Sequence, residues 1–480
     1  MEKRKLFKNS IYNIIYKGLN AIFPLITTAY ISRTLLPEGV GKVSYANTIA
    51  SYFVFLAALG IPNYGVKQIA KSIDNKKNTS KTFFELLIIN GISTTICLFI
   101  YYLIVNNTSL FIDKIDLMNV MGLMIVLNLF NIDWFYQGAE EYGYIAIRSI
   151  VIKIACLLLM FIFVRNSNDF IVYAIILCIG TAGNNLLNCI YIKKFVSFET
   201  NELNIKNHLA PIFILLATAI ATEVYTMLDT VMLEHYHGDT VVGYYTNAVK
   251  IVRMIYTVDV AMLAPFFPRL SNYYSKNNLF EIDKLLSLGT KIILAICIPS
   301  IIGLIGLSDY TVLFLFGNLF LPSGHILKIL SILVLVFSLA YFLGHIVLMS
   351  TNKEKIILKA TVFGAITNIV FNTLLIPRLE GSGAALASVA SEIVVTFIML
   401  YHSRRMFRLD INFKYILSIF SSSFFMLILL ICLKSFLSYS VINLMIIICL
   451  CFVFYVFLLY VTKNEIFTWL CSCIKEKRLK

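Results

Sequence analysis

Long apolar stretches, each of about the length needed to cross a lipid bilayer, follow one another through almost the whole chain. The stretch VINLMIIICLCFVFYVFLLYV at residues 441–461, for example, contains no charged residue. Hydrophobic residues make up 59% of the 480 residues and only 14% are charged, whereas about 25% are charged in soluble domains. Since a transmembrane helix needs about 20 mostly apolar residues, the sequence predicts a polytopic integral membrane protein.

Clusters of charged residues, Pro, Gly and Asn separate the apolar stretches and set the number of helices. The predicted fold class is an all-α polytopic membrane protein with about 14 transmembrane helices. The predicted spans are residues 10–33, 40–62, 82–105, 116–137, 144–165, 169–192, 208–232, 241–264, 287–308, 325–350, 356–377, 381–402, 412–436 and 440–462.

The basic residues give the orientation of these spans. With both termini in the cytoplasm, most of the 40 Lys and Arg residues fall in the inner loops and the two tails, as the positive-inside rule requires. The formal net charge of +14 then follows from the topology, so no nucleic-acid partner is expected.

A weak internal repeat relates two segments of the chain. VGKVSYANTI at 40–49 aligns with VGYYTNAVKI at 242–251, and each copy opens an even-numbered helix. Repeats six helices apart have the same direction, and such parallel repeats place substrate between them. The predicted domains are an N-terminal lobe (1–200, helices 1–6), a C-terminal lobe (201–407, helices 7–12), and two extra helices with a basic cytoplasmic tail (408–480).

Two cations lie deep inside the predicted eighth helix. Lys250 lies nine residues into the span 241–264, roughly 14 Å at 1.5 Å per residue, and Arg253 follows one turn later on the same polar face as Asn247. A Lys or Arg at this depth costs about 2.5–3.5 kcal/mol on insertion scales and is a functional candidate by default.

Three other predicted helices carry matching polar faces, namely the first, the second and the seventh. Together with helix 8 they are the opening pairs of the two repeats, which indicates one shared hydrophilic chamber. The residues of these faces that we single out are Asn13, Lys17, Asn20, Asn47, Glu223 and Asp229. Glu223 and Asp229 have three open interpretations: they bind a coupling cation, they release the basic residues when they are protonated, or they neutralise Lys250 and Arg253 as buried ion pairs.

Two further acids are interpreted as structural. Asp133 lies near the cytoplasmic end of the fourth helix beside Trp134, and a Trp there is typical of an interfacial aromatic belt. Asp259 lies on the face of helix 8 opposite Lys250, near the inner end, and is interpreted as an interfacial charge.

Motifs for nucleotide hydrolysis or metal catalysis are absent from the sequence. EGVGKVS at 38–44 lacks the first Gly and the final Ser or Thr of a P-loop, and no HExxH, GxSxG or Cys/His cluster occurs. The sequence therefore predicts neither an enzyme nor an ATP-driven pump, and no metal or cofactor. Energy is expected from a Na⁺ or H⁺ gradient, from the membrane potential, or from coupled synthesis.

A basic chamber within the membrane favours an anionic substrate, and phosphate groups suit Lys and Arg. A lipid that carries a sugar on a phosphate or pyrophosphate needs a polar lining for its head, cations for its charge and a lipid environment for its tail. Two lobes around a basic cavity meet all three needs.

Four segments resemble one family over essentially the whole chain. They are FKNSIYNIIYKGLNAIFPLITTAYISRTLLPEGVGKVSYANTI, NIDWFYQGAEEYGYIAIRS, LDTVMLEHYHGDTVVGYYTNAVKI and EGSGAALASVASE. They resemble bacterial Wzx-type flippases of O-antigen or capsule repeat units, within the multidrug/oligosaccharidyl-lipid/polysaccharide exporter superfamily. The resemblance implies two six-helix lobes around a cationic cavity that opens alternately to the inside and to the outside.

The resemblance also implies the activity and the roles of the site residues. The expected substrate is an undecaprenyl-pyrophosphate-linked oligosaccharide, moved from the inner to the outer leaflet of a bacterial plasma membrane. Lys17, Lys250 and Arg253 stand where basic residues of helices 1 and 8 face the cavity in lipid II flippases. They are expected to bind the pyrophosphate, while Asn13, Asn20, Asn47 and Asn247 line the sugar chamber.

Other readings stay open at this stage. Membrane lipids are expected partners, and a polysaccharide polymerase and glycosyltransferases are candidate protein partners. The alternatives are a flippase for teichoic-acid or peptidoglycan precursors, a cation-coupled multidrug exporter, and a scaffold for membrane glycosyltransferases. A multidrug exporter should carry acidic residues deep in its first lobe, whereas helix 1 carries Lys17 instead.

Overall fold

The computed structural model describes residues 2–197, 203–407 and 412–468, and it describes their side chains except at 2–22, 25, 214, 215 and 217–226. Within these ranges the chain forms helices and no strands, which confirms the predicted all-α class. Contacts within the chain divide it into two compact units, Met1–Gly243 and Tyr244–Lys480. The predicted lobes, with boundaries after residues 200 and 407, stay a prediction.

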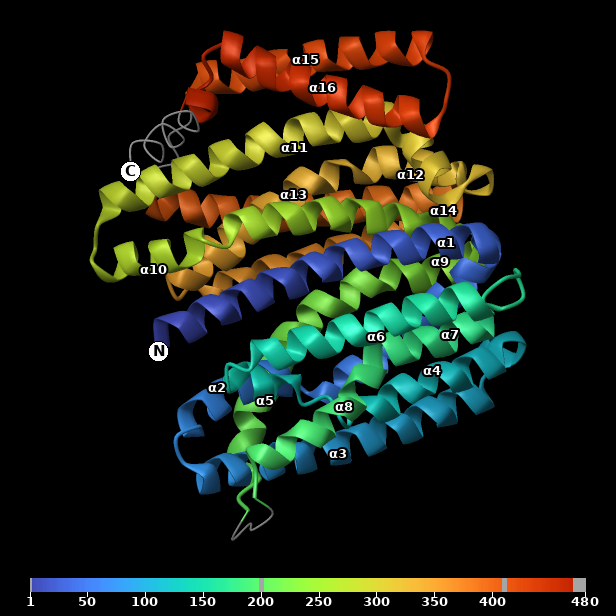
Figure 1. The fold of residues 1–480 in the computed structure, drawn as a ribbon, viewed down its shortest axis with the longest axis vertical. Helices are drawn as coiled ribbons and strands as arrows, with labels where there is room; N and C mark the ends of the chain where they lie inside the picture. Colours follow the sequence, from blue (N-terminus) through green and yellow to red (C-terminus); the bar gives the residue numbers. More distant parts are fainter. Residues whose placement is uncertain (1, 198–202, 408–411, 469–480) are drawn as a thin grey trace. The chain divides into compact units, whose positions relative to one another are not determined.

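One core of the first unit joins four helices. The second half of α1 packs with α3, α4 and α7, which run side by side in Figure 1. Tyr101 at the centre of this core is fully buried and donates to the backbone oxygen of Met118 at 2.6 Å. The elements of this unit are α1 (Glu2–Ala58), α2 (Ile61–Ser72), α3 (Lys76–Asn107), η1 (Ser109–Lys114), α4 (Ile115–Asn128), α5 (Asp133–Gly138), α6 (Tyr142–Phe163), α7 (Phe170–Cys178), η2 (Ile179–Gly183), α8 (Asn184–Tyr191), η3 (Ile192–Lys194) and the first part of α9 (Lys206–Leu263).

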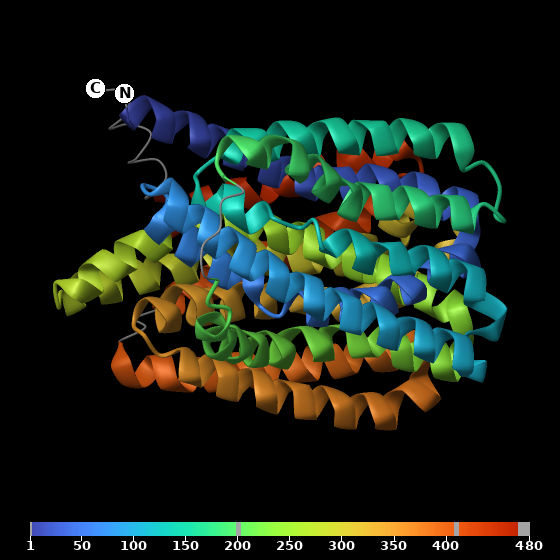
Figure 2. The ribbon, with the colours of Figure 1, turned by 90° about the horizontal axis from the view of Figure 1, so that it is seen from below.

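The second unit continues α9 and adds the C-terminal helix pair. Figure 2 shows α10 and the start of α11 as a hairpin, drawn in yellow-green. The pair α15 and α16 packs against α11 (Figure 1), and Tyr455 donates to the backbone oxygen of Ala295 at 2.8 Å. The remaining elements are α10 (Phe266–Ser275), α11 (Leu279–Phe316), η4 (Asn318–Phe320), α12 (Pro322–Leu330), α13 (Ile332–Tyr341), η5 (Phe342–Leu348), α14 (Glu354–Met406), α15 (Phe413–Phe436) and α16 (Val441–Val461).

Three very long helices contain a break where the sequence predicts a short loop. The breaks are at Leu36 in α1, with φ 62°, at Gly238 in α9, with φ 73°, and at Glu380 in α14, with φ 51°. Glycine adopts positive φ without strain, which explains its place at residue 238. Each of the three helices is therefore two helices joined at a kink.

Contacts across α14 show that its break reverses the chain. A Cβ on Gly364 would lie 2.3 Å from Cγ2 of Val395, and one on Gly383 would lie 2.5 Å from the backbone oxygen of Leu375. Such pairs, equidistant from a centre near Glu380, are the signature of two antiparallel halves.

By length and composition, ten helices in the described ranges are apolar enough to cross a membrane, or eleven with the bent α9–α10 pair. The count of fourteen stays a prediction.

The surfaces of these helices are those of a membrane protein. Large apolar side chains are widely exposed, among them Phe99 on α3 at 68%, and Phe436 and Ile442 at 86% and 72%. Soluble monomers rarely expose contiguous apolar patches above a few hundred Å². The chain is therefore a multi-pass membrane protein.

Candidate functional site

The second half of α9 presents two cations that have no carboxylate partner among the side chains that the structure describes. Lys250 is half-buried, and its Nζ donates to Oδ1 of Asn247 at 3.3 Å. Arg253 is exposed one turn later. Within the described part of the chain, no ion pair involves either residue. Both cations thus keep hydrogen-bond donors available to an anionic ligand.

The opposite face of the same helix segment packs into the second unit. Ala248 is fully buried, Val252 is nearly so, and the hydroxyl of Tyr245 lies 3.0 Å from that of Ser388 on α14. Asn247 is also fully buried, so its amide holds Lys250 from within the protein. This packing fixes α9 about its axis, which sets the direction in which Lys250 and Arg253 project.

The other residues predicted for the site fall into two groups. Asn47 in the second half of α1 is half-buried, and Asp229 on α9 is 3% exposed and lies within electrostatic reach of Tyr52. The side chains of Asn13, Lys17, Asn20 and Glu223 lie outside the described residues. The sharing of one chamber by all these residues stays a prediction.

A second basic centre, which the sequence analysis did not identify, lies in the first unit. The Nζ of Lys114, at the end of η1, lies 2.5 Å from Oε1 of Glu234 and 2.7 Å from Oδ1 of Asp239. It also lies 4.8 Å from the centre of the Tyr45 ring. The two acids are 120 and 125 residues further along the chain. No local sequence pattern therefore predicts this cluster.

Beside this cluster, two glycines make reciprocal backbone contacts. A Cβ on Gly41 would lie 1.7 Å from the backbone oxygen of Asp239, and one on Gly243 would lie 2.2 Å from that of Pro37. Gly243 and Asp239 are Gly41 and Pro37 displaced by the 202 residues of the predicted repeat. The contact of Gly41 with Asp239 therefore has an equivalent in the contact of Gly243 with Pro37. Such a reciprocal pair of contacts is the mark of two-fold symmetry. Only glycine allows so close an approach, and the parallel repeat itself stays a prediction.

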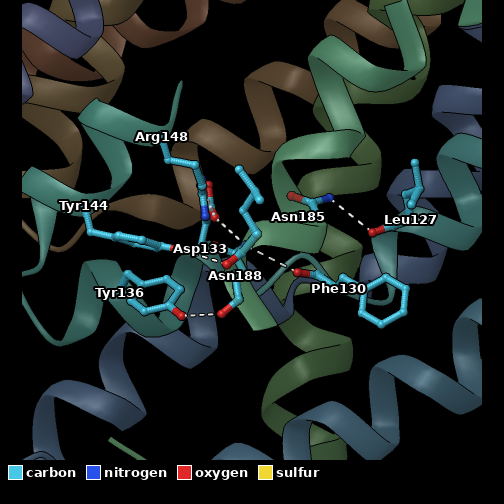
Figure 3. A network of polar contacts seen from close by, with 9 residues as sticks. Leu127, Phe130, Asp133, Tyr136, Tyr144, Arg148, Asn185 and Asn188 are labelled. Atoms are coloured by element: carbon cyan, nitrogen blue, oxygen red, sulfur yellow. Dashed lines mark hydrogen bonds and ion pairs between the residues drawn. The ribbon is translucent and has the colours of Figure 1, made fainter. Parts of the chain in front are cut away.

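A buried polar network joins α5, α6 and α8, as Figure 3 shows. Arg148, 5% exposed, donates from Nη2 to Oδ1 of Asp133 at 2.7 Å, and Nδ2 of Asn188 donates to the same oxygen at 2.8 Å. Nδ2 of Asn188 also reaches the backbone oxygen of Phe130 at 3.3 Å. The network ties α8 to the end of α4, which agrees with a structural role for Asp133.

The structure corrects two of the sequence interpretations. Trp134 is 3% exposed and packs against Gly65 of α2, so it fills the interior of the first unit and belongs to no interfacial belt. Asp259 is 4% exposed, so it is a buried acid and its interpretation as an interfacial charge is wrong. In both cases neighbouring helices cover the side chain. Trp134 also lies on the separate short helix α5 and not at the end of α4, as was predicted.

Comparison with known proteins places this arrangement in a family. Residues 6–274, more than half of the chain, match the family described as "Polysaccharide biosynthesis protein". The chain belongs to this family. Residues 215–374 also match the MatE family. These matches confirm the resemblance inferred from the sequence.

Two curated relatives and one solved structure are similar to most of the chain. A "Putative O-antigen transporter" of Shigella dysenteriae is 24% identical over 82% of this chain and 98% of its own length. "Capsular polysaccharide biosynthesis protein CapF" of Staphylococcus aureus is 24% identical over 84% of this chain and 100% of its own. Among solved structures, "Lipid II flippase MurJ, inward closed conformation" matches with a TM-score of 0.77 at 15% identity, over 96% of this chain and 99% of that one. The last similarity shows a shared fold.

Proposed function

We propose that the protein is a flippase that moves polyprenyl-pyrophosphate-linked oligosaccharide repeat units from the inner to the outer leaflet by alternating access, for O-antigen or capsule-type polysaccharide. The observation that carries the proposal is the pair of cations on α9 with no acidic partner in the described structure. Relatives named as an O-antigen transporter and as a capsular polysaccharide biosynthesis protein support the substrate class.

The pyrophosphate would bind Lys250 and Arg253, with Lys17 as a third contributor from α1. Bidentate Arg and point-charge Lys contacts are the common protein ligands of phosphate oxygens. The amides of Asn13, Asn20, Asn47 and Asn247 would hydrogen-bond sugar hydroxyls or hold the cations in place. No bond of the substrate breaks in this process, so the protein acts as a transporter and not as an enzyme.

The cellular setting follows from the same proposal. The protein would lie in a bacterial plasma membrane with both termini in the cytoplasm, where lipid-linked precursors are assembled. Membrane lipids, a polysaccharide polymerase and glycosyltransferases would be its partners. Glu223 and Asp229 are candidate cation-coupling groups, and translocation should fall in Glu223→Gln/Asp229→Asn; unchanged translocation would remove them from the mechanism.

The test is headgroup movement in liposomes that contain the purified protein and a fluorescent polyprenyl-pyrophosphate oligosaccharide. Wild type should deliver the headgroup to the opposite leaflet, and Lys250→Ala/Arg253→Ala should lose this activity. Lys353→Ala/Lys355→Ala removes the same charge from two exposed side chains and serves as the matched control. Equal loss in both double variants would contradict a specific phosphate site, and no movement by wild type would contradict the flippase.

The match of residues 215–374 to the MatE family favours one alternative, a cation-coupled multidrug exporter. Efflux of a cationic dye from the same liposomes distinguishes the two functions. We expect no dye efflux by wild type, because the described part of α9 offers cations at its accessible face. Dye efflux without lipid movement would favour the exporter.

A further inference from the structure

Asp259 is a buried acid that the proposed transport path does not use. It lies on α9 seven residues after Val252, which places it on the helix face that packs into the second unit. Its Oδ2 accepts a hydrogen bond from Oγ of Ser338 on α13 at 2.8 Å and one from Sγ of Cys297 on α11 at 3.4 Å. The carboxyl group thus joins three membrane helices.

The groups that face this carboxyl bring no positive charge. They are Cys297 from α11, Ser338 from α13 and Tyr256 from the turn of α9 before it. Tyr256 also interacts with Tyr341, with the second buried acid of this region, Glu392 on α14, and with Arg253. Arg253 itself is about 120° away from Asp259 around α9, at 100° per residue. In the described ranges, no salt bridge involves Asp259.

A carboxylate in such a place needs compensation. An ionised acid inside a membrane protein is costly unless it is paired with a cation, and two neutral donors on one oxygen supply only part of the required stabilisation. A metal ion is disfavoured, because the described residues contain no group of three His, Cys, Asp or Glu side chains that could hold one. A proton on the carboxyl removes the charge and leaves Oδ2 able to accept both hydrogen bonds.

The same stretch of helix carries the proposed phosphate site. Asp259 follows Lys250 by nine residues and Arg253 by six, about 14 and 9 Å along the axis. A shift of this segment that changes the environment of the cations therefore also changes that of the acid. If the segment separated from α11 and α13 during transport, water would reach the carboxyl group and would take up its proton; renewed packing would return a proton to the carboxyl.

We propose that Asp259 is a proton-binding site of the transport cycle, protonated while α9 packs against α11 and α13 and ionised when it separates from them. The inference rests on the proposed flippase function for its link to transport, but not for the protonation itself. Since coupling between two sites is reciprocal, proton binding at Asp259 and pyrophosphate binding at Lys250 would influence each other.

The protonation is tested without transport, by infrared spectroscopy of the purified full chain at pH 7. The difference between wild type and Asp259→Asn should contain the carbonyl stretch of a protonated carboxylic acid. Ser338→Ala removes the shorter hydrogen bond and should shift the frequency of this band, which a role in packing alone would not do. Absence of the band in folded wild type would overturn the proposal.

The coupling is tested in liposomes with the fluorescent lipid and an imposed pH gradient. The gradient should change the wild-type rate, and Asp259→Asn, which is permanently uncharged and nearly isosteric, should lose this response. Ser300→Ala removes a hydroxyl of α11 that donates to the backbone oxygen of Ile296; it leaves the groups around Asp259 in place and should retain the response. A response that persists in Asp259→Asn overturns the coupling. If wild type moves no lipid although the band is present, the flippase function fails while the proton site stands.

Discussion

Two lysines of this membrane protein, Lys114 in the first unit and Lys250 in the second, differ in the groups that surround their ammonium charge. Lys114 lies between the carboxylates of Glu234 and Asp239, at 2.5 and 2.7 Å. The Nζ of Lys250 donates to one amide oxygen, Oδ1 of Asn247, at 3.3 Å. A cation that is fully matched by fixed acids has no capacity left for a ligand, whereas one held by an amide keeps its charge available. The comparison separates a structural ion cluster from a binding site.

Removal of Lys114 should lower the stability of the protein, whereas removal of Lys250 should not. Lys114→Ala leaves two poorly exposed carboxylates together without a cation, and breaking buried pairs costs about 3–5 kcal/mol. Since these side chains keep 11–20% exposure, we expect a loss near the lower limit, about 3 kcal/mol, measured by thermal unfolding in detergent. Lys250→Ala leaves no acid unpaired among the described residues and should not lower the Tm.

The triple variant Lys114→Ala/Glu234→Gln/Asp239→Asn is the control for this pair. It removes the charges together and should recover most of the lost stability. If Lys250→Ala proves as destabilising as Lys114→Ala, Lys250 has a structural partner and the comparison fails.

The glycine contact beside Lys114 gives a second, smaller effect. Gly41→Ala places a methyl group 1.7 Å from the backbone oxygen of Asp239, so the backbone must move and carry Asp239 away from Lys114. Overpacking of this kind costs about 1–3 kcal/mol. Gly303→Ala is the matched control, because nothing lies within 4 Å of its added Cβ and alanine favours helix by about 1 kcal/mol. Equal unfolding temperatures for the two variants would contradict the close approach.

The smallest effect is expected where an ion pair is exposed. Lys42 lies 2.6 Å from Glu38, whose side chain is 64% exposed, and such i,i+4 pairs contribute about 0.3–0.5 kcal/mol. Lys42→Ala should therefore change the Tm barely at all, in the same unit where Lys114→Ala lowers it strongly. A large decrease in the Lys42 variant would mean that charge count, and not burial, governs stability here.

Local sequence patterns were enough to predict where several of the helices end. The predicted loops after residues 33, 232 and 377 coincide with the breaks at Leu36, Gly238 and Glu380, because charge, Pro and Gly interrupt a span wherever they occur. On the polar face of the eighth predicted helix, Lys250 is half-buried and Arg253 is exposed, whereas Asn247 is fully buried. The breaks and the polar face depend only on residues within a few turns of each other.

The remainder depends on contacts between distant residues. Glu234 and Asp239 are more than a hundred residues from Lys114, so no local pattern indicates their contact. A helical wheel does not distinguish a lipid-facing side from one covered by other helices, and Trp134 and Asp259 were misinterpreted for this reason. One signal was present but served only to identify the repeat. Gly41 and Gly243 are identical at the repeat spacing, and two glycines at equivalent helix starts indicate a close approach of backbones.

The most direct test of the central claim is the affinity of the purified variants for a polyprenyl-pyrophosphate lipid. Charge-assisted hydrogen bonds contribute about 1.5–3 kcal/mol each, so Lys250→Ala should raise the Kd by roughly 10- to 100-fold. A folded Lys114→Ala/Glu234→Gln/Asp239→Asn variant should bind like wild type, because its lysine was already matched. Equal losses in the two variants, or an unchanged Kd in Lys250→Ala, would contradict the account of Lys250 as the cation kept for the pyrophosphate.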